Sequence, residues 1–214
     1  MIRQILTMAI CCIGAAKSAS AQDWKSYNFY QPYPGYVITL TGDTLRGYVV
    51  HGDRVQNQQK AIFYADVNDK KTKKEYKPAD LKGYRVGDKE YRTIQYSGGL
   101  LKKPLNFILV KDDARILTLL HYTKEELGFI QVRKSGETDQ EYDERICTEE
   151  VLFKKGDEEL IKLTSFLMNF KKNMEKLVSD HTELYAKVQR GDKGYGKLNV
   201  LDIIKEYNQT YKGN

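Results

Sequence analysis

The chain has 214 residues, of which 41% are hydrophobic and 30% charged, and its formal net charge is +6 at pH 7. This length is enough for one large domain, or for one domain with an appendage. The excess of positive charge is modest and scattered along the chain, which argues against a nucleic acid as the partner.

Residues 1–21 have the three-part layout of a secretory signal peptide. Arg3 gives a positive start, an apolar run extends from Ile5 to Ala16, and the small residues Ala19 and Ala21 precede Gln22. The apolar run is shorter than the roughly 20 residues that a membrane-spanning helix needs. We therefore expect cleavage after Ala21, export to the periplasm or the extracellular space, and no transmembrane segment in the mature chain.

Lipidation at Cys11 or Cys12 is the alternative to simple cleavage, because both cysteines lie inside the apolar run. With simple cleavage, Cys147 is the one cysteine that remains, and a single cysteine cannot form an internal disulfide. Removal of Arg3 and Lys17, with no acidic residue, lowers the net charge from +6 to +4.

Residues 22–34 form a separate short segment, with the sequence QDWKSYNFYQPYP. Proline disfavours regular structure. We expect an extended aromatic arm that lies on the domain and is anchored by its rings.

The next segment, residues 35–155, has the pattern of an antiparallel β domain. It opens with GYVITLTGDTLRGYVV, where alternating side chains flank a central Gly42–Asp43 pair. A two-residue turn at this pair would place Leu40 opposite Leu45, because glycine tolerates the positive φ of such turns. The core face would then consist of Tyr36, Ile38, Leu40, Leu45 and Val49. Asp43 is therefore expected in a turn rather than in a catalytic site.

The hairpin pattern recurs at Gly87–Asp88 and again near Asp112–Asp113. In the second hairpin, Arg85 would face Glu90 and Tyr84 would face Tyr91, and both are favourable cross-strand pairs. Further runs that favour strands are KAIFYAD, LGFIQVRK, EYDERIC and EVLFKK. Short strands separated by turn signals predict an α+β fold with an antiparallel meander, as a sandwich or an open barrel.

Residues 156–214 change to a helical period and predict three helices packed on the sheet. The first carries an apolar stripe at helical spacing, formed by Leu160, Leu163, Leu167, Phe170, Met174 and Leu177. The second begins after Asp180 and ends near Gly191, and the third follows Asn199. The alternative is that the stripe pairs with a partner chain.

Several segments together resemble a family of exported proteins of unknown function from Bacteroidota-type bacteria. They are the signal ending in SAQ, the segment GYVITLTGDTLRGYVV, the later YKPADLKGYRVGDKEY, and the C-terminal IIKEYN. The resemblance covers most of the mature chain. It implies export and assigns no catalytic residues.

Residues capable of chemistry are few and scattered. His51, His121 and His181 show no metal-binding spacing, and Cys147 lies among acidic residues, which do not favour a reactive thiolate. We expect no catalytic residues, no metal and no cofactor.

The candidate ligand-binding residues are Tyr84, Tyr91, Lys82 and Lys89, which we expect on one solvent-facing side of the second hairpin. Tyrosine suits recognition surfaces because its ring is apolar and its hydroxyl can stay hydrated. We therefore predict an exported, non-enzymatic binding or interaction module of the cell envelope, with an envelope protein or a glycan as partner. The alternative is a secreted hydrolase that acts on carbohydrate or peptide through an unrecognised carboxylate site. A third possibility is an assembly role for the C-terminal helices.

Overall fold

The computed structural model describes residues 25–96, 104–125 and 131–212. Within these residues, ten strands form one antiparallel sheet in the order β10-β9-β8-β7-β6-β5-β1-β2-β3-β4, and α-helices follow at its C-terminal end. The predicted α+β class is confirmed. The strands are β1 (Gln31–Thr39), β2 (Thr44–His51), β3 (Ala61–Tyr64), β4 (Lys73–Tyr76), β5 (Leu81–Val86), β6 (Lys89–Gln95), β7 (Leu105–Asp112), β8 (Ile116–Lys124), β9 (Cys147–Lys155) and β10 (Ile161–Lys162). The α-helices are α1 (Arg54–Gln59), α2 (Asp139–Ile146), α3 (Phe166–Val178), α4 (Thr182–Arg190) and α5 (Val200–Thr210).

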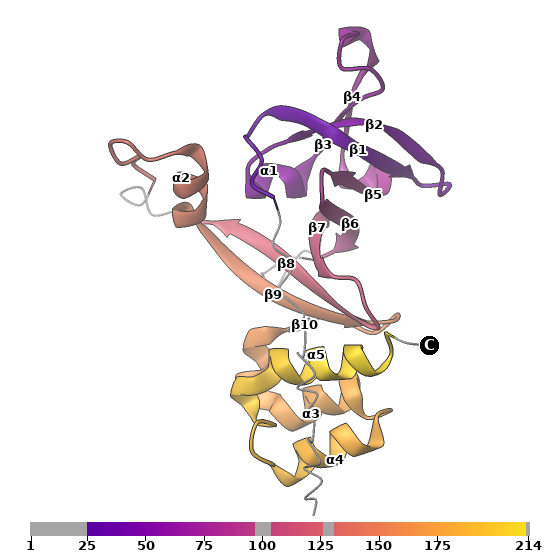
Figure 1. Ribbon diagram of the computed structural model, residues 1–214, viewed down its shortest axis with the longest axis vertical. Helices are drawn as coiled ribbons and strands as arrows, with labels where there is room; N and C mark the ends of the chain where they lie inside the picture. Colours follow the sequence, from indigo (N-terminus) through magenta and orange to yellow (C-terminus); the bar gives the residue numbers. More distant parts are fainter. Residues whose placement is uncertain (1–24, 97–103, 126–130, 213–214) are drawn as a thin grey trace, which may run out of the picture.

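The molecule is elongated, with the long β8–β9 hairpin crossing its middle (Figure 1). Strands β1 to β5 and α1 lie at one end, and the helices α3, α4 and α5 lie at the other. Helix α2 lies at one tip of the hairpin. Between the edge strands β4 and β10, the described strands form one continuous antiparallel sheet.

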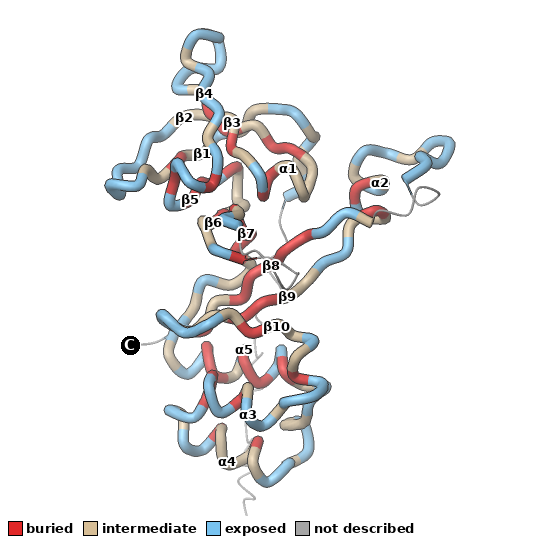
Figure 2. Tube along the Cα trace, turned by 180° about the vertical axis from the view of Figure 1, so that it is seen from behind, coloured by how far each residue is buried: buried red, intermediate tan, exposed pale blue. Residues whose placement is uncertain are grey.

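The β8–β9 hairpin connects two hydrophobic cores that lie along one of its faces. At the end of the strand pair farthest from the segment that connects β8 to β9, Ile116 and Phe153 pack against the C-terminal helices. Farther along the same strand, Leu120 and Tyr122 join a core that gathers buried residues from β1 to β8. Figure 2 shows these buried stretches in the middle of β8 and β9 and on the inner side of the helices.

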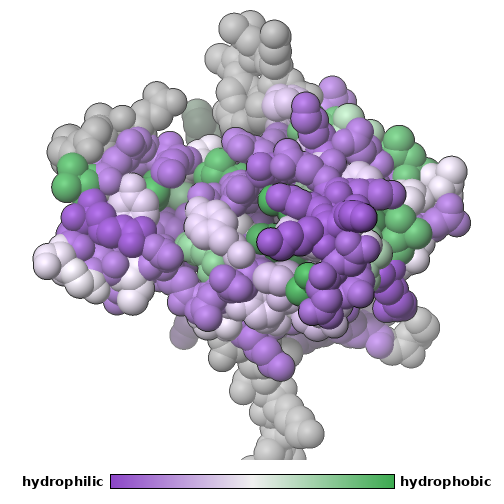
Figure 3. All heavy atoms as spheres, turned by 90° about the horizontal axis from the view of Figure 1, so that it is seen from above, coloured by the Kyte–Doolittle hydropathy of each residue, from purple (hydrophilic) through white to green (hydrophobic). Residues whose placement is uncertain are grey.

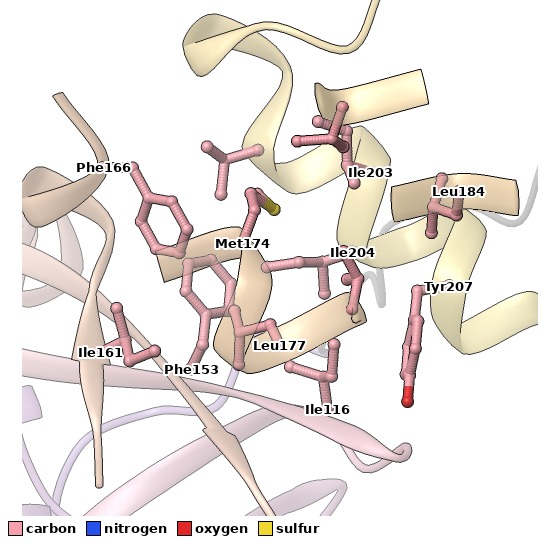
Figure 4. Packing of buried hydrophobic residues seen from close by; sticks show 13 residues of the cluster. Ile116, Phe153, Ile161, Phe166, Met174, Leu177, Leu184, Ile203, Ile204 and Tyr207 are labelled. Carbon is pink, nitrogen blue, oxygen red and sulfur yellow. The ribbon is translucent and has the colours of Figure 1, made fainter. Parts of the chain in front are cut away.

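The C-terminal helices bury their apolar faces against the strands, as predicted. Phe153 meets the ring of Phe166 edge-on at 5.8 Å between ring centroids, and Met174 and Leu177 fill the space toward α5 (Figure 4). His181 caps α4 by accepting a hydrogen bond from the amide of Leu184, and Gly191 ends that helix in the left-handed conformation that favours glycine.

The start of the first helix differs from the prediction. Ile161 pairs with Phe153 in the sheet, so α3 begins only at Phe166, and Asn169 interrupts it with a non-helical conformation. Leu167 is consequently 58% exposed rather than part of the apolar stripe. Pairing with the sheet edge thus overrides the helical period of residues 160–165.

The first hairpin forms, but its predicted register and core face are wrong. Thr39 pairs with Asp43 around a three-residue loop, because the positive φ of Gly42 falls at the third loop position and not at the first. The register moves by three residues, and this turns β1 over. Val37 is therefore buried, whereas Leu40 is 58% and Leu45 40% exposed. Asp43 lies in the exposed turn, where it accepts a hydrogen bond from Thr41.

The other two hairpins agree with the prediction. Tyr84 pairs with Tyr91 and Arg85 with Glu90, as expected. The third reversal follows Asp112 and joins β7 to β8.

Two expected segments have a different structure. EYDERIC forms most of the helix α2, because Thr138 and Glu141 make a reciprocal capping box at its start. Residues 131–134 of LGFIQVRK are not a strand, and its first four residues lie outside the described part. The arm is shorter than expected, since Gln31 begins β1. Pro32 and Pro34 fit there because that stretch of β1 pairs with β2 alone.

Candidate functional site: a pocket beneath the N-terminal arm

A pocket of about 350 Å³ lies where the curled sheet, α1, α2 and the N-terminal residues 25–29 meet. This size is at the small end of the range for ligand pockets. Seen from above, the described surface is mainly hydrophilic, with smaller hydrophobic groups between and beside the polar residues (Figure 3).

Strand register builds the floor of the pocket. Tyr91 on β6 lies opposite Leu109 on β7, and Tyr122 on β8 lies opposite Glu149 on β9. Lys89 precedes Tyr91 by two residues and so projects from the same face of β6. The floor therefore has an apolar and aromatic middle, with Lys89 at one end and Glu149 at the other.

The roof is α1, which buried amide side chains hold on the sheet. Gln58 donates to the carbonyl of Tyr122 at 2.7 Å and accepts from its amide at 2.8 Å. Asn57 makes the same two-way contact with Gly52, and Tyr84 donates its hydroxyl proton to the carbonyl of Asn57 at 2.7 Å. Because buried polar groups without partners are costly, these paired contacts fix the position of α1.

An ion pair joins the roof to α2. The guanidinium of Arg54 lies 3.1 Å from Asp143 and 3.0 Å from Glu144, and it stands over the ring of Tyr122 at 5.3 Å. The side chain of Asp143 is only 5% exposed. Burial raises the pKa of Asp143, and the charge of Arg54 opposes this effect.

The N-terminal arm closes one side of the pocket. The side-chain amide of Gln140 on α2 donates to the hydroxyl of Ser26 at 2.6 Å and to the carbonyl of Tyr27 at 3.0 Å. The backbone amide of Lys25 donates to the carboxylate of Asp88 at 2.8 Å. The arm is thus tied both to α2 and to the turn between β5 and β6.

His51 and Lys89 form an unusual pair of basic groups in this pocket. The ammonium nitrogen of Lys89 lies 3.2 Å from Nε2 of His51. Burial, followed by the charges of Lys89 and Arg54, lowers the pKa of His51 to about 3, so its ring is neutral at pH 7. Nε2 then accepts from Lys89, and the proton lies on the buried Nδ1, which has no hydrogen-bond partner among the residues that the structure describes.

Lys89 itself is a half-buried cation that forms no ion pair with the described residues. Among the described residues, no carboxylate oxygen lies within 4.0 Å of its nitrogen. Burial lowers the pKa of Lys89, and the nearby charge of Asp88 opposes this effect only in part.

The four predicted ligand-binding residues do not form one exposed patch, so that expectation is wrong. Tyr84 is 1% and Tyr91 3% exposed, and their rings stack in the core at 4.6 Å between centroids. Lys82 lies on the outer side of β5. Lys89 and Tyr91 do line the pocket, on its inner side.

The other candidates from the sequence are distributed over the fold. His51 lines the pocket, His121 is buried beside the ring of Tyr96 on the opposite face of β8, and His181 caps α4. Burial raises the pKa of the Cys147 thiol to about 12, so the thiol stays protonated at neutral pH.

In residues 25–96, 104–125 and 131–212, no group of three or more histidine, cysteine or acidic side chains is placed to hold a metal ion. None of the helices in these stretches combines the length and the apolar character that a membrane span requires.

Comparisons with family models, curated proteins and solved structures found no match to this chain. Membership of the exported Bacteroidota-type family stays a prediction.

Proposed function

We propose that this chain is an exported, non-enzymatic protein of the cell envelope that binds a small molecule with an anionic group in the pocket beneath its arm. Lys89 carries the proposal. Its ammonium group is half-buried in the pocket, where it contacts the neutral imidazole of His51 at 3.2 Å and the ring of Tyr27 at 5.6 Å and forms no ion pair with the described residues. A ligand anion would supply the missing counter-charge and make a charge-assisted hydrogen bond. Export is supported by the signal-peptide pattern of residues 1–21.

Replacing Lys89 by methionine should remove the bound ligand while keeping the apolar part of the side chain. The test is to purify the tagged protein from its native envelope and identify by mass spectrometry the small molecules that it releases on denaturation. We expect the parent to release an anionic compound and Lys89→Met to release at least about tenfold less, the ratio that a loss of 1.4 kcal/mol produces.

Lys82→Met is the matched control, because it makes the same chemical change on the exposed side of the neighbouring strand β5. This control should retain the ligand at the level of the parent. If Lys89→Met retained it equally well, or if the parent released nothing anionic, the proposed site would be wrong.

The non-enzymatic assignment rests on the contacts of the carboxylates in the pocket, which are already bound to neighbouring side chains. Asp143 and Glu144 share the guanidinium of Arg54, and Glu149 accepts a hydrogen bond from the Tyr122 hydroxyl at 3.0 Å. The protonated thiol of Cys147 is a weak nucleophile. These contacts stabilise the pocket walls, and they suit binding better than proton transfer.

The hydrolase alternative is favoured by one observation. Asp143, Glu144 and Glu149 line the same pocket, and burial raises the pKa of Asp143, as in a general acid. If the alternative holds, the protein should cleave chromogenic glycosides or peptides, and Asp143→Asn should lower kcat at least 100-fold, the lower end for loss of a general acid. We expect no turnover by the parent above the level of the heat-denatured protein.

A further inference from the structure

We infer that the ligand of this pocket is a small zwitterion, a di- or tripeptide with free termini, whose carboxylate lies at Lys89 and whose amino group lies at Glu149. This inference rests on the proposed function and specifies its substrate class. It follows from the separation of charge along the floor of the pocket.

One end of the floor is basic. Lys89 projects there beside the neutral ring of His51, and Lys25 on the arm lines the same pocket. Neither ammonium nitrogen forms an ion pair with a carboxylate in the described part of the chain. Asp88 is an acid near this end, where it accepts from the backbone amide of Lys25, but it does not line the pocket. A ligand carboxylate at this end would meet two ammonium groups that line the pocket.

The other end is acidic. Three carboxylates, from Asp143, Glu144 and Glu149, line it together with the single guanidinium of Arg54. Asp143 and Glu144 both form ion pairs with that guanidinium, so its positive charge is offset by two carboxylates. Glu149 takes the Tyr122 hydroxyl on one oxygen, which leaves its other oxygen for a ligand amine.

The two ends are separated both across the strands and along them. Lys89 lies on β6 and Glu149 on β9, with β7 and β8 between them, and the register offsets the two residues by four positions along the strands. At about 4.8 Å per strand spacing and about 3.4 Å per residue, their Cα atoms would be roughly 20 Å apart in a flat sheet, and the curl of the sheet shortens this distance. The lysine and glutamate side chains take up part of it. A di- or tripeptide, at about 3.5 Å per residue, fits the remainder.

The middle of the floor matches a peptide backbone with small side chains. Tyr91, Leu109 and Tyr122 all line the pocket, and together they offer an apolar surface that includes two phenol rings. A ligand with a single charge would leave the charge at the opposite end of the pocket without a counter-charge. A ligand with a carboxylate and an amine provides a counter-charge at both ends.

The test is isothermal titration of the exported, processed protein with four matched probes. These are alanyl-alanine, its N-acetyl form, its C-terminal amide, and the form blocked at both ends. We expect alanyl-alanine to bind best, each singly blocked form to bind at least tenfold more weakly, and the doubly blocked form to bind most weakly.

Two variants assign the ends. Lys89→Met should abolish the preference for a free carboxylate and keep the preference for a free amine, and Glu149→Gln should do the reverse. Lys82→Met should behave as the parent does. This crossed pattern separates a ligand contact from a general loss of folding, which would weaken all probes equally.

The inference is overturned if the doubly blocked probe binds as tightly as the free dipeptide, if blocking the amine has no effect, or if none of the four probes binds. None of these outcomes tests the proposed function, which is tested separately by purification from the native envelope. There, two results count against it: Lys89→Met retains the ligand, or the parent releases no anionic compound.

Discussion

Replacing Phe153 by alanine should lower the free energy of unfolding by about 3–5 kcal/mol, the usual cost of removing a fully buried phenylalanine. The side chain is 0% exposed and lies between Phe166, Ile161 and the helices (Figure 4). Its removal leaves a cavity at the junction between the β8–β9 hairpin and the helical segment. Urea denaturation followed by far-ultraviolet circular dichroism measures the loss.

Met168→Ala is the control for this prediction, since Met168 is 89% exposed at the start of α3. An exposed side chain of this kind should contribute within about 0.5 kcal/mol. Equal effects of the two substitutions would show that the helices do not pack on the sheet at Phe153.

Acidification should destabilise the protein before its carboxylates titrate. An unfolded histidine binds a proton near pH 6.5, whereas His51 in the folded protein has a pKa of about 3. The stability that His51 contributes is thus fully present above pH 6.5 and is lost as the pH falls toward 3. At about 1.4 kcal/mol per pKa unit, the free energy of unfolding falls by about 2 kcal/mol between pH 6.5 and pH 5. At pH 3, where His51 in the folded protein is itself half-protonated, the loss is roughly 4 kcal/mol.

The groups around His51 fix the sign of this effect. Lys89 and Arg54 oppose its protonation, and Asp88 favours it less strongly. Burial also lowers the pKa of His121, which adds a contribution of the same sign. Asp143 acts in the opposite direction, because burial raises its pKa and its protonation relieves a buried charge.

Urea denaturation at several pH values between 7 and 5 tests this prediction. In His51→Asn the dependence of unfolding free energy on pH should become clearly shallower. His181→Asn makes the same chemical change outside the pocket, where asparagine can still cap α4. A parent whose stability is constant from pH 7 to 5 would contradict the burial of a neutral His51.

The two Gly-Asp hairpins show how far sequence reasoning extends here. In the second, the predicted register is confirmed, because a charge pair and an aromatic pair both agree with it. In the first, the sequence did not distinguish a glycine at the first loop position from one at the third. Long-range pairing decides between them, because β1 also pairs with β5, where Val37 lies opposite Tyr84.

The pocket was hidden from sequence reasoning for a related reason. Lysines at alternate positions suggested that Tyr84 and Tyr91 face solvent, but α1 covers them, and the Tyr84 hydroxyl finds a backbone carbonyl there. Arg54 and Asp143, which close the pocket, are separated by 89 residues. The sequence did indicate one part of the pocket, because Lys89 and Tyr91 are two residues apart and therefore share one face of a strand.

Because β5 lies beside β1, the roof of the pocket can vary between related chains independently of the rest of the sheet. Thr39, where β1 ends, pairs with Leu81, where β5 begins, so the intervening stretch starts and finishes at neighbouring points of the sheet. This stretch contains β2, α1, β3 and β4 and therefore includes the whole roof of the pocket. A single continuous exchange of residues 40–80 between related chains should replace the roof as one unit, while the charged residues Lys89 and Glu149 stay with the rest of the scaffold.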